Sequence, residues 1–135
     1  MKVAIVHDSI PEFGGAERVV AALLELVPSA HLYTAYVDRS VMKKHFFHIP
    51  AAHLHTSRIQ DSFFQNSPFL CQMLAPVIWA TFDLEAYDLV ISCPSFLLCN
   101  LVQVKNPVHI QYIQALPRNL MDGKLAMPHS ALNFF

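Results

Sequence analysis

The groups most able to do chemistry lie where an apolar run meets a helical pattern near the N-terminus. The run Val3–Val6 is followed by His7 and Asp8, and the adjacent Gly14 and Gly15 come just before the helical pattern. Glycines at the start of a helix let backbone N–H groups approach an anion or a sugar hydroxyl, because no Cβ stands in the way. Two of the three glycines of the chain are here, which favours a ligand-binding turn. The alternative is a tight turn with no ligand.

Polar side chains flank this turn on both sides. His7 and Asp8 stand where a strand would end, so either could bind an acceptor hydroxyl, or Asp8 could cap the loop. Glu17 falls in the first helical turn, where a carboxylate complements the helix dipole. Arg18 could pair with Glu17 or with a phosphate, and a solvated face is the alternative for both. The glycines do not complete a G-x-G-x-x-G pattern, which argues against a dinucleotide.

Histidine and cysteine spacing offers no clear metal or redox motif. His53 and His55 would share one face of a strand, and His45 and His48 one face of a helix, but neither pair has a third ligand at a readable spacing. No two of the three cysteines form a CxxC pair, so we expect neither a disulfide framework nor a zinc site, and a reducing compartment. We expect no metal and no cofactor, and we assign no catalytic residue.

Composition limits the class of protein. A length of 135 residues fits one domain. Charged residues make up 14% of the chain, against about 25% in soluble domains, so part of the surface is expected to face something other than water: a partner domain, a second copy or a membrane. The net charge of −1 gives no electrostatic case for nucleic acid. The longest apolar stretch, Phe69–Ala80, falls short of the roughly 20 residues needed to cross a bilayer.

Apolar β-branched segments alternate with helical patterns, which is typical of a parallel sheet covered on both faces. The expected strands are Lys2–His7, His31–Val37, His53–Thr56, Asp88–Ser92 and Val108–Ile113. The expected helices are Ala16–Leu26, a short one around Val41–His45, Ser67–Phe82 with an interruption at Pro76, and Pro94–Val102. We expect the inner strands to include Val3–Val6, Leu89–Ser92 and Val108–Ile113. Ligands of such sheets bind beyond the carboxyl ends of the strands, so the loops Asp8–Gly15, Cys93–Phe96 and Gln114–Asp122 should converge on one rim.

Five segments carry a resemblance to a known family. In chain order they read VAIVHDSIPEFGGAERVV, AHLYTAYVD, HTSRIQDSFFQNSPF, FDLEAYDLVIS and HIQYIQALPRNLMD. Together they resemble the N-terminal domain of the family 4 (group 1) retaining glycosyltransferases, in particular the bacterial mannosyltransferase-like branch that builds surface polysaccharide. The pieces GGAER and YDLVIS, in this order and at this separation, are the most specific part of the resemblance.

This resemblance implies one half of a two-domain GT-B enzyme. Residues 1–135 would be a single Rossmann-like domain that holds the acceptor, and the C-terminal domain that binds the nucleotide sugar would lie beyond this chain. The implied reaction moves a hexose to a glycan or lipid-linked acceptor, in the cytoplasm or peripherally at the inner membrane face. The chain alone is expected to be inactive and to self-associate through its bare cleft wall.

The resemblance also implies site residues. The implied substrate-binding residues are Asp8, Gly14, Gly15, Glu17, Gln114, Arg118 and Asp122. The chain departs from the family at Ser9, where an aromatic residue is usual, and at Gln114-Ala115-Leu116, where His-Thr-Pro is usual. The turn Cys93–Leu98 is also unusually apolar. The missing histidine supports a second hypothesis, a catalytically inactive Rossmann-like binding module that pairs with another chain.

Overall fold

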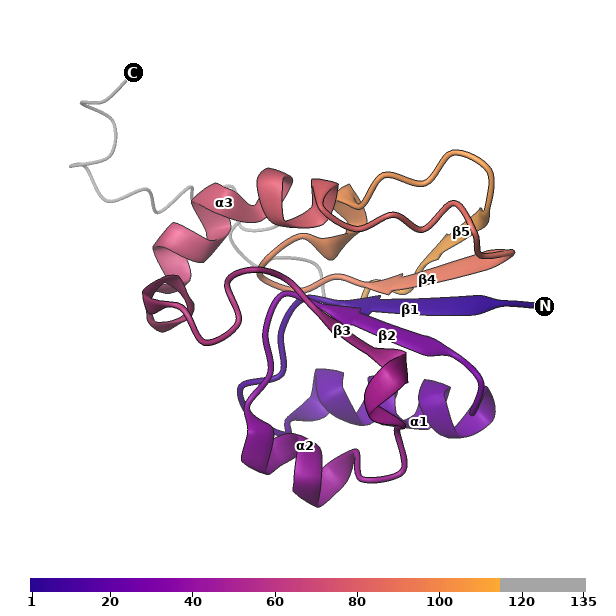
Figure 1. The fold of residues 1–135 in the computed structure, drawn as a ribbon, viewed down its shortest axis with the longest axis horizontal. Coiled ribbons are helices and arrows are strands. Elements are labelled where there is room, and N and C mark those ends of the chain that lie inside the picture. Colours follow the sequence, from indigo (N-terminus) through magenta and orange to yellow (C-terminus); the bar gives the residue numbers. More distant parts are fainter. Residues whose placement is uncertain (115–135) are drawn as a thin grey trace.

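A five-stranded parallel sheet lies between two helical layers in the computed structural model, which describes residues 1–114 (Figure 1). The strands are β1 (Val3–His7), β2 (His31–Thr34), β3 (Leu54–Thr56), β4 (Leu89–Cys93) and β5 (Val108–Gln111). Their order is β3-β2-β1-β4-β5, and every neighbouring pair is parallel. The predicted α/β, Rossmann-like three-layer fold is therefore confirmed.

Helices cover the two faces of the sheet unequally. The α-helices are α1 (Gly15–Leu26), α2 (Arg39–His45) and α3 (Pro68–Ala80), and the short 3₁₀ turns are η1 (Ala51–His53), η2 (Phe63–Asn66) and η3 (Cys99–Leu101). Figure 1 shows α1 and α2 on one face and α3 on the other. Strand β1 is central and buried along its whole length, because both faces of a parallel sheet must be covered.

Each face of β1 contributes to its own hydrophobic cluster. Val3 and Ile5 pack in the cluster that contains Val20 and Leu24 of α1. Ala4 and Val6 belong to the opposite cluster, whose largest buried side chain is Trp79 of α3. The carboxyl end of β1 is thus held rigidly between two cores, and the loop that follows starts from a fixed point.

Local sequence sets the helix ends. The Asp38 side chain caps α2 by accepting the N–H groups of Ser40 and Val41. Helix α3 begins after the Ser67 cap with proline as its first residue. It runs through Pro76 without the expected interruption. Pro76 has no N–H to donate to the carbonyl of Gln72 one turn earlier, and Gln72 is an exposed residue.

Two predicted elements are wrong. The segment Pro94–Val102 is not a helix, since only Cys99–Leu101 forms a 3₁₀ turn, and the reason is a distant carboxylate described below. Strand β5 is an edge strand of the described sheet rather than an inner one. Its apolar side chains are largely exposed, with Val108 at 64% and Ile110 at 49%. Strand β2 also stops at Thr34, and Val37 forms only an isolated bridge to Ile10.

Candidate functional site

The glycine turn lies at the carboxyl end of β1, as predicted. Gly14 is the N-cap of α1 with φ −102°, and Gly15 is the first residue of the helix. A Cβ on Gly14 would lie 3.1 Å from Oε2 of Glu17, whereas a Cβ on Gly15 would meet nothing within 4 Å among residues 1–114. Neither glycine needs a positive φ. The space beside Gly15 is open, so a ligand could approach the helix N-terminus there.

The Asp8 carboxylate points into the molecule. It is only 2% exposed. Its Oδ2 accepts the backbone N–H groups of Ser95 at 2.8 Å and Leu97 at 2.6 Å, and its Oδ1 accepts the N–H of Cys99 at 2.8 Å. Of the two interpretations left open for Asp8, this geometry favours the capping one. The loop that Asp8 holds is the loop after β4, not its own.

These three hydrogen bonds fix an unusual loop conformation. Leu98 lies in the left-handed region with φ 53°, which is uncommon for a residue with a Cβ and persists only when neighbours enforce it. The indole of Trp79 adds a 2.7 Å hydrogen bond to the Leu97 carbonyl. Leu97 is buried, while Phe96 and Leu98 remain exposed at the surface.

His7 and Glu17 meet behind the glycine turn. His7 is 1% exposed and Glu17 is 9% exposed. Nδ1 of His7 lies 3.0 Å from the Cys93 carbonyl, and Nε2 lies 3.4 Å from Oε1 of Glu17. The other carboxylate oxygen of Glu17 accepts the N–H of Gly14 at 2.9 Å. Glu17 therefore supports the turn from within instead of facing solvent.

Gln114 joins the end of β5 to this region. Its Nε2 donates to the Ala16 carbonyl at 3.4 Å, so the chain after β5 lies beside the first turn of α1. The loops after β1 and β4 and the residue Gln114 thus come together around the glycine turn. Arg118 and Asp122, the other two candidate binding residues, lie outside the described residues.

Two hollows at the same rim contain residues that sequence reasoning missed. One, of about 200 Å³, is lined by Pro11, Tyr36, Val37, Asp38, Gln65 and Asn66. The other, of about 350 Å³, lies between the loop Pro11–Phe13 and the first turns of α2. Their position in the sequence could have indicated them, because Tyr36 and Asp38 come soon after β2 and ligands bind beyond the carboxyl ends of strands.

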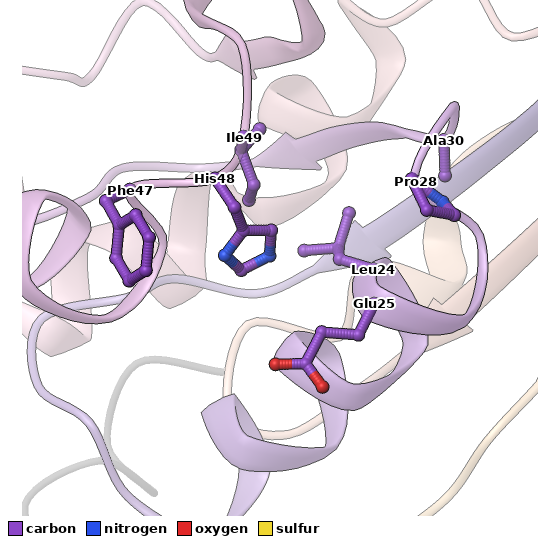
Figure 2. Close-up of a pocket in the computed structure, with 7 residues that line it drawn as sticks. All are labelled: Leu24, Glu25, Pro28, Ala30, Phe47, His48 and Ile49. Carbon is purple, nitrogen blue, oxygen red and sulfur yellow. The ribbon is translucent and has the colours of Figure 1, made fainter.

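A hollow larger than these two lies elsewhere (Figure 2). It measures about 410 Å³ and is lined by Leu24, Glu25, Pro28, Ala30, Phe47, His48 and Ile49. Pro28 and Ala30 precede β2, so this cavity is at the amino ends of the strands. It contains none of the predicted site residues, and its two titratable side chains, Glu25 and His48, are exposed.

Three histidines gather at this amino end. His31 stacks on His53 with ring centroids 4.3 Å apart, and Nδ1 of His31 lies 2.8 Å from Nε2 of His55. Burial lowers the pKa of His31 and of His55, and the neighbouring imidazoles lower both further. Sequence spacing had not linked His31 to the His53-x-His55 pair. Even so, no three such groups in residues 1–114 are arranged to hold a metal ion.

Comparisons with family models, curated proteins and solved structures gave no match to this chain. None of the helices in the described part of the chain has the length and apolar content that crossing a bilayer requires.

Proposed function

We propose that this chain is the acceptor-side domain of a glycosyltransferase that moves a hexose from a nucleotide sugar to a glycan or lipid-linked acceptor. The proposal rests on the sequence resemblance and on one structural observation. At the carboxyl rim, no atom of residues 1–114 fills the space beside Gly15, where the loop after β1, the loop after β4 and Gln114 come together.

Backbone groups at this place suit an acceptor. The first N–H groups of α1 have no partner within the helix, and the first intrahelical bond joins the Arg18 N–H to the Gly14 carbonyl. Unpaired N–H groups at a helix N-terminus bind hydroxyl and phosphate oxygens. A residue without a Cβ at position 15 lets such a ligand reach them.

Side chains beside the turn could orient the sugar. The hollow next to Pro11 contains the amides of Gln65 and Asn66, the Tyr36 side chain and the Asp38 carboxylate. Oδ1 of Asp38 already accepts the N–H groups of Ser40 and Val41, which caps α2. Groups of this kind fix the position of a polar ligand, which is the part an acceptor domain plays when catalysis depends on proximity and orientation.

Asp8 and Glu17 serve this site as supports. Each is buried, and its oxygens are engaged by N–H groups or by His7 of the same chain. We therefore revise the two substrate-binding assignments to positioning roles, and we name no catalytic residue among residues 1–114. Retention and the hexose donor follow from the resemblance alone.

The second candidate function is an inactive binding module that pairs with another chain. One observation favours it: at position 114 an amide takes the place of the family's histidine, and it donates to a backbone carbonyl. An amide has no useful basicity, so it cannot act as a general base.

The experiment is an NMR titration of the 135-residue chain with methyl α-mannoside and methyl α-glucoside. We expect the amides of Gly14, Gly15, Ala16 and Gln114 to shift, while those around Phe47 and His48 stay unchanged. Shifts confined to the cavity near Phe47 would contradict an acceptor site at the rim. The absence of any shift at millimolar ligand would favour the binding module.

A further inference from the structure

A buried pair, His7 and Glu17, connects three parts of the rim. His7 ends β1, Glu17 belongs to the first turn of α1, and the Cys93 carbonyl ends β4. The imidazole lies between the carbonyl at 3.0 Å and the carboxylate at 3.4 Å, and the same carboxylate holds the Gly14 N–H at 2.9 Å. A change in the His7–Glu17 contact would therefore also change the hydrogen bond between Glu17 and the Gly14 N–H in the glycine turn.

Both neighbours of the imidazole are acceptors. A backbone carbonyl can only accept, so Nδ1 of His7 must carry a proton to bond to Cys93. A neutral imidazole has a single N–H, which leaves Nε2 with a lone pair facing the Glu17 oxygen. Only the imidazolium donates to both. We propose that His7 is held as an imidazolium, and that loss of its second proton releases Glu17 and with it the glycine turn.

The carboxylate side of the pair is consistent with this charge state. Burial raises the pKa of Glu17, but the hydrogen bonds from His7 and from backbone N–H groups outweigh burial and leave the pKa below its ordinary value. Glu17 is therefore ionised at neutral pH. A buried carboxylate is stable only when a cation or several donors compensate it.

Within residues 1–114, the groups around His7 supply no other cation. On its own strand, Asp8 is occupied by three backbone N–H groups. From β4 and η3 come the Cys93 and Cys99 thiols, whose pKa values are raised by burial and then by Asp8, so both stay neutral. From β2, the residue paired with His7 is the uncharged Thr34. Glu17 is thus the charged group that contacts the ring.

The release step needs no reactant beyond water or hydroxide. As pH rises, Nε2 gives its proton to solvent, and its lone pair then faces the carboxylate. Glu17 loses its compensating charge and gains by turning towards water, which breaks its bond to the Gly14 N–H. The closed turn belongs to the protonated state and the released turn to the deprotonated state. This inference does not depend on the proposed function.

The first test is the ¹⁵N NMR spectrum of the imidazole of His7 in the 135-residue chain at about pH 7. We expect both ring nitrogens to carry protons. A spectrum with an unprotonated Nε2, including the case in which the proton resides on Glu17, would overturn the proposal.

The second test follows the Gly14 amide as pH rises. Its proton shift should change with the same midpoint as the His7 ring, because the two share Glu17. In Glu17→Gln, whose amide can donate to a neutral ring, the second proton should leave at least about one pH unit lower, a tenfold loss of proton affinity. Glu25→Gln, on the exposed face of α1, should leave the midpoint unchanged. If the proton shift of the Gly14 amide stayed constant while the His7 ring lost its proton, the proposed coupling between His7 and the glycine turn would be overturned.

Discussion

At the scale of single residues, the acidic side chains of the rim point inward. In sequence, Asp8 and Glu17 look like ligand-binding groups because they flank a glycine turn. In the structure, they are buried and hold backbone N–H groups of two loops. A carboxylate that collects several N–H groups orders the backbone around it. The open position of the turn is Gly15, which has no side chain at all.

The two glycines should respond differently to alanine. Gly14→Ala would place a Cβ 3.1 Å from Oε2 of Glu17, so the carboxylate must shift, and we expect a loss of about 1 kcal/mol in the free energy of unfolding. In Gly15→Ala the new Cβ meets no atom of the described residues within 4 Å, so the change should be neutral or slightly stabilising, since alanine restricts the unfolded chain. Urea unfolding checks both. Equal destabilisation by the two variants would contradict the open space at Gly15.

The histidine cluster should make stability depend on pH. The pKa values of His31 and His55 are lowered in the folded state, so the unfolded chain binds protons more readily as pH falls. The stability that His31 and His55 contribute should therefore be full above the ordinary histidine pKa of about 6.5 and should decline as pH drops below it. Melting temperatures at about pH 7.5 and pH 5.5 measure this decline.

The double variant His31→Gln/His55→Gln should flatten that decline, and His48→Gln, at an exposed site, should not. The range from about pH 7.5 to about pH 5.5 separates this effect from that of Glu17. The pKa of Glu17 is lowered, so its contribution to the free energy of unfolding is lost only below about pH 4.5. A decline that persists unchanged in the double variant would assign the effect to other groups.

At the scale of elements, the loop after β4 depends on one distant side chain. Asp8 binds the N–H groups of residues 87 to 91 positions away. In Asp8→Ala the buried N–H groups of Leu97 and Cys99 would lose their partner, and each unsatisfied buried group costs about 1–3 kcal/mol. We expect a total loss of at least about 2 kcal/mol in urea unfolding.

The matched control is Glu12→Ala, an exposed carboxylate in the same loop after β1, which should change stability little. If Asp8→Ala unfolded at the wild-type urea concentration, the loop would be held by its own packing and by the Trp79 bond to Leu97.

Comparing the expected elements with the observed ones shows which of them the sequence can predict. The apolar runs around Val3–Val6 and Leu89–Ser92 were correctly placed inside the sheet, because continuous β-branched segments are typical of buried parallel strands. The segment Pro94–Val102 has a helical apolar pattern, but its N–H groups bond to Asp8, and no local pattern encodes that partner. Val108–Ile113 reads VHIQYI, and its assignment to the inner strands overlooked the polar residues His109 and Gln111 that alternate with the apolar ones.

The candidate site was predictable to a similar degree. The position of the glycine turn follows from a strand and a helix that meet, and the fold confirms it. The direction of each side chain does not follow, because it depends on which backbone donors the tertiary structure brings near. The sequence therefore predicted the right location for His7, Asp8 and Glu17 but left their roles open. It did not predict the hollow beside Tyr36.

At the scale of the whole molecule, apolar side chains remain on the surface of α3. Phe69, Met73 and Val77 repeat every four residues along one face and are 64–68% exposed. With 14% charged residues in the chain, little polar surface offsets this stripe. Such patches cause association between copies when nothing covers them.

We therefore expect the 135-residue chain to self-associate in light scattering. The double variant Phe69→Gln/Val77→Gln should shift it towards monomer without lowering its melting temperature, because both side chains are outside the core. Leu26→Gln, which removes an isolated exposed leucine on α1, should have little effect. A clean monomer at high concentration for the unmodified chain would contradict this expectation.

Sugar transfer tests whether the glycine turn is the acceptor site of a hexosyltransferase. The measurement is transfer of labelled hexose from nucleotide sugars by the complete gene product that carries this chain, for the wild type, Gly15→Val and Ala22→Val. We expect transfer by the wild type, a loss of at least about tenfold for Gly15→Val, equivalent to roughly 1.4 kcal/mol, and little change for Ala22→Val on the exposed face of α1. Because a Cβ at position 15 has no atom of the described residues within 4 Å, the folded state should survive. Wild-type rates in Gly15→Val, or no transfer from any nucleotide sugar by the folded wild type, would contradict this assignment.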